Sequence, residues 1–352
     1  MRAQDLPNFK DMPAVKGMPH GTAWGLWDKN GERDNCGSLN LLTPENTIEA
    51  QKEIQTGKGV ALKYVYTSLT FSSFTRSFIR SFVLQLKANH SWNLENVHAP
   101  GFQRETPKHT FKDLKPLGFV AFDDLIHINT QSGSQWDGLR HWGHQDTGLY
   151  YNGLHHDEIP LPSHAEENGI HHFTRRGGIV GRGVLIDYVA YAARHNISYS
   201  PTTRHEISVG DLETAAREQG VEFRPADILL VRSGWVKWYE GADAEVRVKG
   251  ARDGHEHVGV AGNGETVEWL WNHHFAAVAG DAIAFEAWPP KAPYRLHDHL
   301  LAMWGTPIGE LWNLEELAEV CKKGNKYSFF LTSAPLNVHG GVASPPNALA
   351  IM

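Results

Sequence analysis

The chain of 352 residues has few cysteines and no long apolar run, and each shortage excludes a class of protein. Its 2 cysteines, Cys36 and Cys321, cannot build a disulfide framework or a cysteine-rich zinc site. A membrane-spanning helix would need about 18 consecutive apolar residues, and no such stretch is present. The first residues, MRAQDLPNFKDMP, also lack the apolar run of a signal peptide, so we expect a cytoplasmic location.

An excess of positive charge is also missing. Lys and Arg total 33 against 40 Asp and Glu, a formal net charge of −7, whereas a general nucleic-acid or anionic-membrane binder needs a basic surface. The sequence contains no Gly-x-Ser-x-Gly elbow, no phosphate loop and no His-Glu-x-x-His helix. The glycine-rich stretch 178–183 precedes an apolar run, which predicts a tight turn before a strand and not a dinucleotide site. We therefore expect a small-molecule substrate, and neither nucleic acid nor a membrane as partner.

Apolar runs of strand length outnumber helical patterns along the chain. Residues 1–35 are interrupted by Pro and Gly and predict an extended N-terminal arm, followed by a single domain at 36–352. Residues 239–264, rich in Gly and charge, predict a long loop. The predicted strands lie at 60–66, 77–86, 120–128, 184–191, 228–232, 276–285, 327–331 and 348–352. The predicted helices follow a cap at Thr43, cover 211–219 and 265–274, and begin again at a cap at Asn313. This pattern predicts an α/β domain with mixed sheets and few helices.

Histidine is abundant, and its 21 residues invite a metal or acid–base interpretation. Side chains adjacent in sequence diverge on regular elements, so neighbouring histidines seldom bind one metal together. We therefore interpret three adjacent pairs as surface or hydrogen-bonded residues: His155-His156, His171-His172 and His273-His274.

One polar segment directly follows the predicted strand at 120–128. Gln131, Gln135 and Asp137 recur there at even spacing, and in an extended chain residues two and four apart lie on the same face. His141 follows Asp137 by four residues and can return to the same pocket through a turn. A carboxylate, two amides and an imidazole suit a metal or an acid–base centre in a cleft. A hydrogen-bonded polar turn explains the spacing equally well.

A second group of acids and imidazoles lies far downstream beside apolar sequence: Asp281, Glu286, His297 and Glu310. An unpaired charge is costly in such surroundings. These side chains are therefore expected either to form a site or to pair with one another at strand ends.

From about residue 27 to its end, the chain resembles the cyclase family, which includes kynurenine formamidase, isatin hydrolase and enzymes named polyketide cyclases. The family motif His-x-Gly-Thr-His-x-Asp-x-x-x-His corresponds to residues 131–141. Gln131 and Gln135 stand where the family has its two histidine ligands, whereas Asp137 and His141 match. Further similar segments lie at 34–44, 181–187, 227–235, 279–281, 297–301 and 335–345.

The resemblance implies a swivelling β/β/α fold and a hydrolase that cleaves a small amide, lactone or cyclic amide with water activated by a divalent metal. It implies His141 as the catalytic acid and base, with Glu310 completing the catalytic pair. The implied metal ligands are Asp137, His297, Gln131 and Gln135. Mn or Zn is expected, and Mg is a further candidate because an amide oxygen is a hard, neutral ligand. Complete loss of the metal is the alternative.

Trp136, Trp142 and His144 flank the motif and are expected to line the pocket, where they would favour an aromatic or planar substrate. Two other functions stay open at this point. One is a cyclase or lyase of a secondary metabolite on the same fold, and the other is a metal-free, non-catalytic binding protein. The 12 tryptophans and the N-terminal arm, together with the resemblance, lead us to expect a homodimer or homotetramer.

Overall fold

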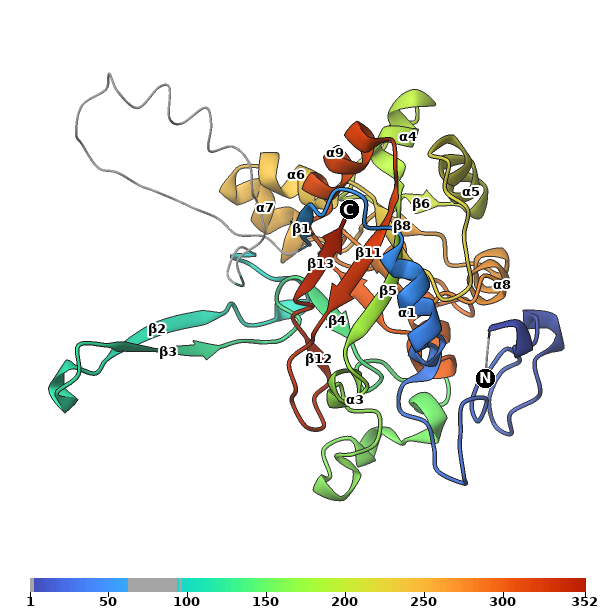
Figure 1. Ribbon diagram of the computed structural model, residues 1–352, viewed down its shortest axis with the longest axis horizontal. Coiled ribbons are helices and arrows are strands. Elements are labelled where there is room, and N and C mark those ends of the chain that lie inside the picture. The colour runs from blue at the N-terminus through green and yellow to red at the C-terminus, as the bar shows by residue number, and fades with distance from the viewer. Residues whose placement is uncertain (1–2, 63–93, 95–96) are drawn as a thin grey trace.

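The computed structural model describes residues 3–62, 94 and 97–352, and a curled nine-stranded mixed sheet forms its centre (Figure 1). The strand order is β1-β13-β11-β5-β7-β9-β10-β4-β12. These strands span β1 Gly59–Ala61, β4 Gln135–Asp137, β5 Ile179–Asp187, β7 Ile228–Arg232, β9 Ala277–Gly280, β10 Ile308–Glu310, β11 Ser328–Ser333, β12 Ala343–Ser344 and β13 Ala348–Ile351. Neighbours from β5 through β7 and β9 to β10 are parallel, and the other pairs are antiparallel. The predicted α/β class with mixed sheets is confirmed.

Short helices surround this sheet, and most of them begin at a side-chain cap. They are α1 Pro44–Gln51, α3 His171–Arg175, α4 Tyr188–Arg194, α5 Val209–Glu218, α6 Trp235–Gly241, α7 Ala244–Ala251, α8 Gly264–Asn272 and α9 Glu315–Gly324, with a π-helix, η9, at Asp298–Met303. The Thr43 side chain caps α1, as predicted, and Ser208 and Asn263 cap α5 and α8. Asn313 accepts a hydrogen bond from the Glu315 amide at the start of α9. None of the described helices combines the length and the apolar character needed to cross a bilayer.

The central strands are buried on both faces, as their composition predicts. All five residues of β7 are buried, and this strand coincides with the predicted strand at 228–232. An uninterrupted apolar run is typical of a parallel strand covered on both faces.

The glycine-rich stretch at 178–183 differs from its prediction. Instead of forming a turn, Ile179 and the residues after it belong to β5. A Cβ at Gly183 would overlap the Phe329 ring, and one at Gly181 would overlap the Leu42 side chain. These glycines therefore allow close packing inside the sheet, and the predicted turn is wrong except at Gly178 itself, whose φ is +85°.

Two other segments also differ. The strand predicted at 184–191 ends at Asp187, because the Asp187 carboxylate accepts a hydrogen bond from the Ala190 amide and starts α4. The loop predicted at 239–264 contains α7 and the short strand β8 Gly259–Val260, which pairs with β6 Glu206–Ile207. The predicted strand at 77–86, and residues 63–66 of the first one, lie outside the described residues.

The N-terminal residues have little regular structure but pack against the body of the protein. Trp24 Nε1 donates to the Ala302 carbonyl at 2.8 Å, and Trp271 Nε1 donates to the Pro7 carbonyl at 2.8 Å. Leu6 and Trp27 are buried. This segment therefore covers α8 and the π-helix η9, beside one end of the sheet.

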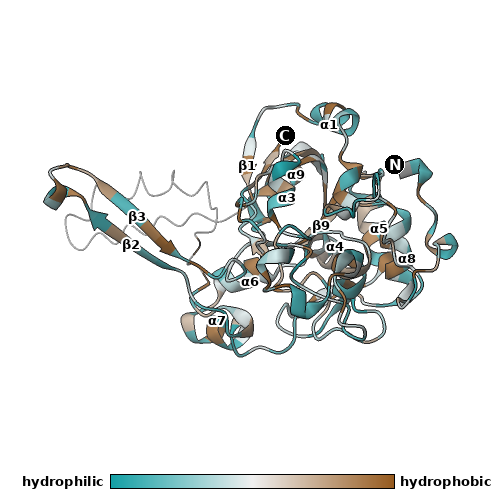
Figure 2. Cartoon of the chain, turned by 90° about the horizontal axis from the view of Figure 1, so that it is seen from below, coloured by the Kyte–Doolittle hydropathy of each residue, from teal (hydrophilic) through white to brown (hydrophobic). Residues whose placement is uncertain are grey.

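A two-stranded hairpin, β2 Lys108–Asp113 and β3 Phe122–His127, projects away from the body (Figures 1 and 2). Every residue of both strands is exposed. Arg104 lies shortly before β2 and Gln131 shortly after β3, so the base of the hairpin lies close to the polar segment singled out in the sequence.

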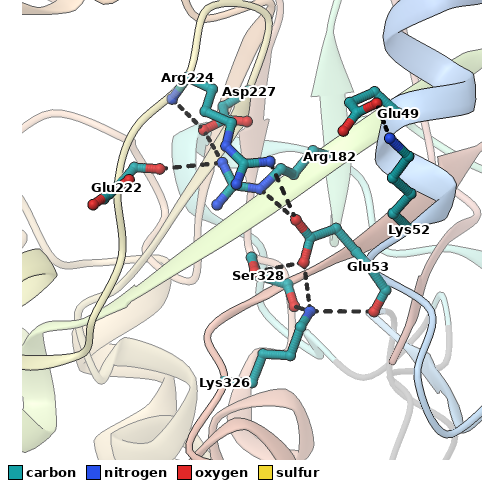
Figure 3. A network of polar contacts seen from close by, with 9 residues as sticks. All are labelled: Glu49, Lys52, Glu53, Arg182, Glu222, Arg224, Asp227, Lys326 and Ser328. Atoms are coloured by element: carbon teal, nitrogen blue, oxygen red, sulfur yellow. Dashed lines mark hydrogen bonds and ion pairs between the residues drawn. The ribbon is translucent and has the colours of Figure 1, made fainter.

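A network of charges, several of them buried, joins Glu53, which follows α1, to the sheet (Figure 3). Glu53 accepts hydrogen bonds from Arg182 Nε at 2.8 Å and from Lys326 Nζ at 2.6 Å, and Arg182 NH1 donates to Asp227 at 2.7 Å. Each charge in this network has an opposite partner, which is the condition for burying it.

Candidate active site

The floor of the candidate site forms where β4 pairs with β10. Gln135 and Glu310 are directly opposite in this antiparallel register, so their side chains lie on the same face. Asp137 shares that face because it lies two residues further along β4. The register therefore brings Gln135 and Asp137 of β4 together with Glu310 of β10, and these side chains form the floor of the site.

Two glutamine amides donate hydrogen bonds to the carboxylates of this floor. Gln131 Nε2 donates to Asp137 Oδ1 at 2.7 Å, and Gln135 Nε2 donates to the same oxygen at 3.0 Å and to Glu310 Oε2 at 2.9 Å. Gln131, Gln135 and Asp137 converge as predicted, but Gln131 does so from a turn and not from the extended chain on which the prediction relied.

The groups that contact the nitrogen and the oxygen of the Gln135 side-chain amide determine its orientation. Ionised carboxylates only accept hydrogen bonds, and the guanidinium of Arg104 only donates; its NH1 lies 3.4 Å from Gln135 Oε1. Gln131 and Gln135 thus present nitrogen, not oxygen, to the carboxylates. Their role as oxygen ligands of a metal stays a prediction. It requires both side-chain amides to rotate so that the oxygen, and not the nitrogen, faces the ion.

His141 lies at the edge of the floor and is its most accessible ionisable group, with 19% of the side chain exposed. Its Nδ1 accepts a hydrogen bond from Gln131 Nε2 at 2.9 Å, and its Nε2 lies 3.9 Å from Asp137 Oδ2. Burial lowers the pKa of His141, and the nearby Asp137 carboxylate opposes this effect. The imidazole is therefore neutral near pH 7, as a proton acceptor must be.

Glu286 orients His297 on the other side of the floor. Its Oε1 accepts from both the backbone amide and Nδ1 of His297, at 2.9 and 2.6 Å. His297 Nε2 then lies 3.3 Å from Glu310 Oε1. Burial disfavours a charged imidazole, but the hydrogen bonds to Glu286 and Glu310 outweigh it and raise the pKa of His297 well above its usual value. Burial and the Asp137 charge raise the pKa of Glu310 to about 7, against the influence of His297.

Asp137, His297 and Glu310 form a group that fits a divalent metal. One potential ligand atom from each lies within 4.8 Å of the others, and all three residues are buried. Asp137 Oδ2 is buried and has no hydrogen-bond partner in the part of the chain that the structure describes. Such an orphaned carboxylate oxygen is costly, and a cation would satisfy it. Two carboxylates and one imidazole are an ordinary ligand set for Zn²⁺ or Mn²⁺.

Glu166, His171 and His339 form a second cluster of potential ligands, at the surface. The Gly340 amide donates to His171 Nδ1 at 3.0 Å, so a neutral His171 carries its proton on Nε2, which faces Glu166 at 3.3 Å. A metal at Nε2 would require the opposite tautomer. Arg175 also pairs with the Glu166 carboxylate. This cluster is an ion-pair network, in which the buried His171 is satisfied by hydrogen bonds.

Aromatic side chains form one wall beside the floor. The Trp142 ring lies 5.1 Å from the His297 ring, and Trp142 Nε1 donates to Asp298 at 2.6 Å. The centre of the Trp288 ring lies 6.5 Å from that of Trp142, and the centre of the Phe102 ring lies 5.2 Å from that of Trp288. Trp142 is thus beside the site, where the sequence places it, and its contact with a substrate stays a prediction.

Of the two other predicted pocket residues, Trp136 is not at the floor, and the pocket role of His144 stays a prediction. Trp136 points to the opposite face of β4, where it is fully buried, packs on Trp312 at 4.7 Å and donates from Nε1 to Ser333. His144 is buried, and its Nδ1 lies 3.2 Å from the Thr147 hydroxyl. Within the described ranges, neither makes a hydrogen bond to the floor residues. Asp281 also lies apart, where it accepts three hydrogen bonds from Ser233 and Gly234.

The sequence interpretation missed Arg104 and Phe102 as residues of this site and left the role of Glu286 open. Glu286 carried a signal, since it is an acid within apolar sequence. Arg104 carried none, because it reaches Gln131 only across the base of the hairpin.

A family model described as Cyclase matches residues 95–287, which is more than half of the chain. The chain belongs to this cyclase family. A solved structure described as a novel cyclase has 29% sequence identity and a TM-score of 0.72, and the similarity covers 94% of this chain and 99% of that one. The predicted family and the cyclase-like fold are confirmed.

Isatin hydrolase A from Ralstonia solanacearum is a more distant structural neighbour of this cyclase-family chain. It has 17% sequence identity and a TM-score of 0.51, and the similarity covers 79% of this chain and 98% of that one. At this identity the likeness shows a shared fold. No curated protein matches the sequence.

Proposed function

We propose that this cyclase-family protein is a hydrolase that cleaves a small amide, lactone or cyclic amide at the floor between β4 and β10. One observation carries the proposal: the buried, unpartnered Asp137 Oδ2 lies in a ligand cluster with His297 and Glu310, and 3.9 Å from the accessible His141. Membership of the cyclase family supports an enzyme of the hydrolase or cyclase type.

Asp137, His297 and Glu310 would hold a divalent ion, for which Mn²⁺ or Zn²⁺ is the best match to the ligand set. When bound, such an ion polarises a carbonyl group and lowers the pKa of water. Glu286 fixes the imidazole of His297 through Nδ1, so that Nε2 is directed towards Glu310 and the centre of the cluster.

His141 would move the proton of the reaction. Its neutral imidazole accepts a proton from the attacking water and returns it to the leaving nitrogen or oxygen. In the described structure the Gln131 amide donates a hydrogen bond to His141 Nδ1 and so holds the ring in place. This hydrogen bond must break before Nδ1 can accept a proton from the water. Glu310 would orient that water in addition to helping to hold the ion.

The wall formed by Phe102, Trp142 and Trp288 favours a planar substrate. Aromatic rings offer large, flat apolar surfaces, and the polar groups of the floor supply orientation on one side only. We therefore propose a substrate whose scissile bond lies on, or next to, a planar ring.

Hydrolysis assays test this proposal directly. Wild-type protein should release acid from at least one of three classes: formylated anilides, lactones and isatin-like rings. His141→Ala should lower kcat by roughly 100-fold or more, the usual contribution of a positioned acid and base. His195→Ala, which changes an exposed histidine paired with Glu218, is the matched control and should keep wild-type turnover. Unchanged kcat in His141→Ala refutes the assigned role, and absence of acid product from all three classes contradicts hydrolysis and favours a cyclase.

A further inference from the structure

We propose that Arg104 binds a negatively charged oxygen of the substrate, so that the site selects planar molecules that carry a carboxylate. This inference rests on the proposed function for the place where the substrate lies, but it does not depend on which bond is cleaved.

Arg104 lies at the border between the polar floor and the aromatic wall. It directly follows the short helix Gly101–Gln103 and precedes the hairpin. Its NH1 donates to the Gln131 carbonyl at 2.8 Å and lies 3.4 Å from Gln135 Oε1. Its guanidinium carbon lies 5.0 Å from the centre of the Phe102 ring. A molecule stacked on the wall and reaching the floor would therefore pass next to this guanidinium.

Arg104 acts on the acid Glu310 only from a distance, where its charge opposes the rise in the pKa of that carboxyl caused by burial, without a close ion pair. Its two hydrogen bonds go to neutral amide oxygens, and it makes no ion pair with any residue that the structure describes. The buried arginines Arg182 and Arg232 differ in this respect, whereas the buried Arg140, like Arg104, bonds only to neutral oxygens. Arg182 pairs with Glu53 and Asp227 (Figure 3), and Arg232 pairs with Asp187 and Glu315.

Arg104 also has hydrogen-bond donors to spare. Only its NH1 makes hydrogen bonds within the described chain, whereas a guanidinium carries five N–H groups in a planar fork. That fork matches the two oxygens of a carboxylate, which is why arginine is the usual residue for recognising this group.

The backbone before Arg104 adopts an unusual conformation. Phe102 and Gln103 both have φ of +56°, although neither is glycine. Consecutive residues of this kind are rare, and they occur where the surrounding structure must hold a side chain in a particular place. Here the conformation places Phe102 on Trp288 and directs Arg104 to the floor.

An anionic substrate needs a cation at this position. Before an ion is bound, the carboxylates of Asp137 and Glu310 would repel a further negative charge unless a nearby cation pairs with it, and Arg104 is close enough to Glu310 to oppose the rise in its pKa that burial causes. Gln131 contacts Arg104 through its carbonyl and His141 through its amide nitrogen. An oxygen held by Arg104 would therefore lie near the proposed acid and base.

Binding of benzoate and benzamide separates charge recognition from shape, because the two molecules have similar size and differ in charge. Calorimetric titrations would compare wild type, Arg104→Met and Arg104→Lys. The control is Arg194→Met, which removes an exposed arginine paired with Glu218. Wild type and the control should bind benzoate at least about 10-fold more tightly than benzamide, as one charge-assisted pair would give. Arg104→Met should lose this preference while benzamide affinity stays within about twofold.

Two results would overturn the inference. One is equal wild-type affinity for both probes. The other is an equal loss of both affinities in Arg104→Met, which would mean that Arg104 only holds Gln131 and Gln135 in place. Arg104→Lys keeps the charge without the fork, so it should retain part of the benzoate preference even if the Met variant does not fold. Repeating the titrations with a chelator separates binding at Arg104 from binding to a metal.

The titrations require no turnover, so failure of the two proposals can be told apart. A preference for benzoate in a protein that hydrolyses none of the three substrate classes would support Arg104 as an anion-binding residue and contradict the hydrolase. A protein that hydrolyses one of the substrates but shows no preference for benzoate would support the hydrolase and contradict anion binding by Arg104.

Discussion

His257 is a buried imidazole next to the aromatic wall, and we expect it to make the stability of the folded protein dependent on pH. The residue is 2% exposed, and its Nδ1 has no hydrogen-bond partner among the residues described. Its backbone exchanges two hydrogen bonds with Trp288, at 3.0 and 3.1 Å. Burial, with a smaller contribution from His255, lowers the pKa of His257 from 6.5 to about 4. The folded protein therefore holds this imidazole neutral.

The sign of the effect follows from this depressed pKa. Above pH 6.5 both the folded and the unfolded chain carry a neutral His257, and its contribution to stability is complete. As the pH falls from 6.5 towards 4, the unfolded chain binds a proton that the folded chain does not bind, so folding becomes less favourable. The difference between the two pKa values corresponds to roughly 3 kcal/mol.

Urea unfolding at a series of pH values between 7 and 4 would measure this effect. His257→Phe removes the titration and keeps a ring, so its free energy of unfolding should fall by roughly 3 kcal/mol less than that of wild type over this range. His195→Phe, a change at an exposed histidine, should follow wild type. Parallel curves for wild type and His257→Phe would refute the reasoning, whatever the absolute stability of the variant.

Two further sets of substitutions test the network of Figure 3 and the glutamine pair of the floor. Glu53→Ala leaves the buried Arg182 with one acid fewer and should cost about 3–5 kcal/mol in urea unfolding. Arg182→Met should also destabilise, because it leaves the buried Asp227 without its arginine, but the double variant should lose less than the sum of the two single losses; additive losses would contradict the pairing of Glu53 with Arg182. Gln131→His combined with Gln135→His supplies two imidazoles in place of two amides and should tighten Zn²⁺ binding by roughly 100-fold, measured by competition with a coloured chelator; unchanged affinity would mean that these positions do not face the ion.

Local patterns in the sequence predicted the core strands and part of the floor. The apolar run at 228–232 became β7, and the even spacing of Gln135 and Asp137 became a shared polar face of β4, which Gln131 joins from the preceding turn. The same spacing also implies that Trp136, between two residues of one face, lies on the other. Its assignment to the pocket therefore conflicted with strand alternation, and the structure places it in the core.

Contacts set by sheet register could not be predicted in this way. Glu310 meets Gln135 only because β10 pairs antiparallel with β4, and a single sequence does not reveal which strands become neighbours. Arg104 reaches the floor because the hairpin returns the chain beside its own start. The glycines at 181 and 183 were mistaken for a turn because their small size serves packing against Leu42 and Phe329, which lie far away in sequence.

The hydrolytic centre proposed at β4 and β10 requires a divalent ion that depends on Asp137. Calorimetric titration of Mn²⁺ into chelator-treated protein tests this requirement most directly. Wild type should bind one ion per chain, and Asp137→Asn should weaken binding by roughly 100-fold, because it replaces the buried charged oxygen by a neutral amide. No binding by wild type, or equal binding by both proteins, would contradict the proposed centre.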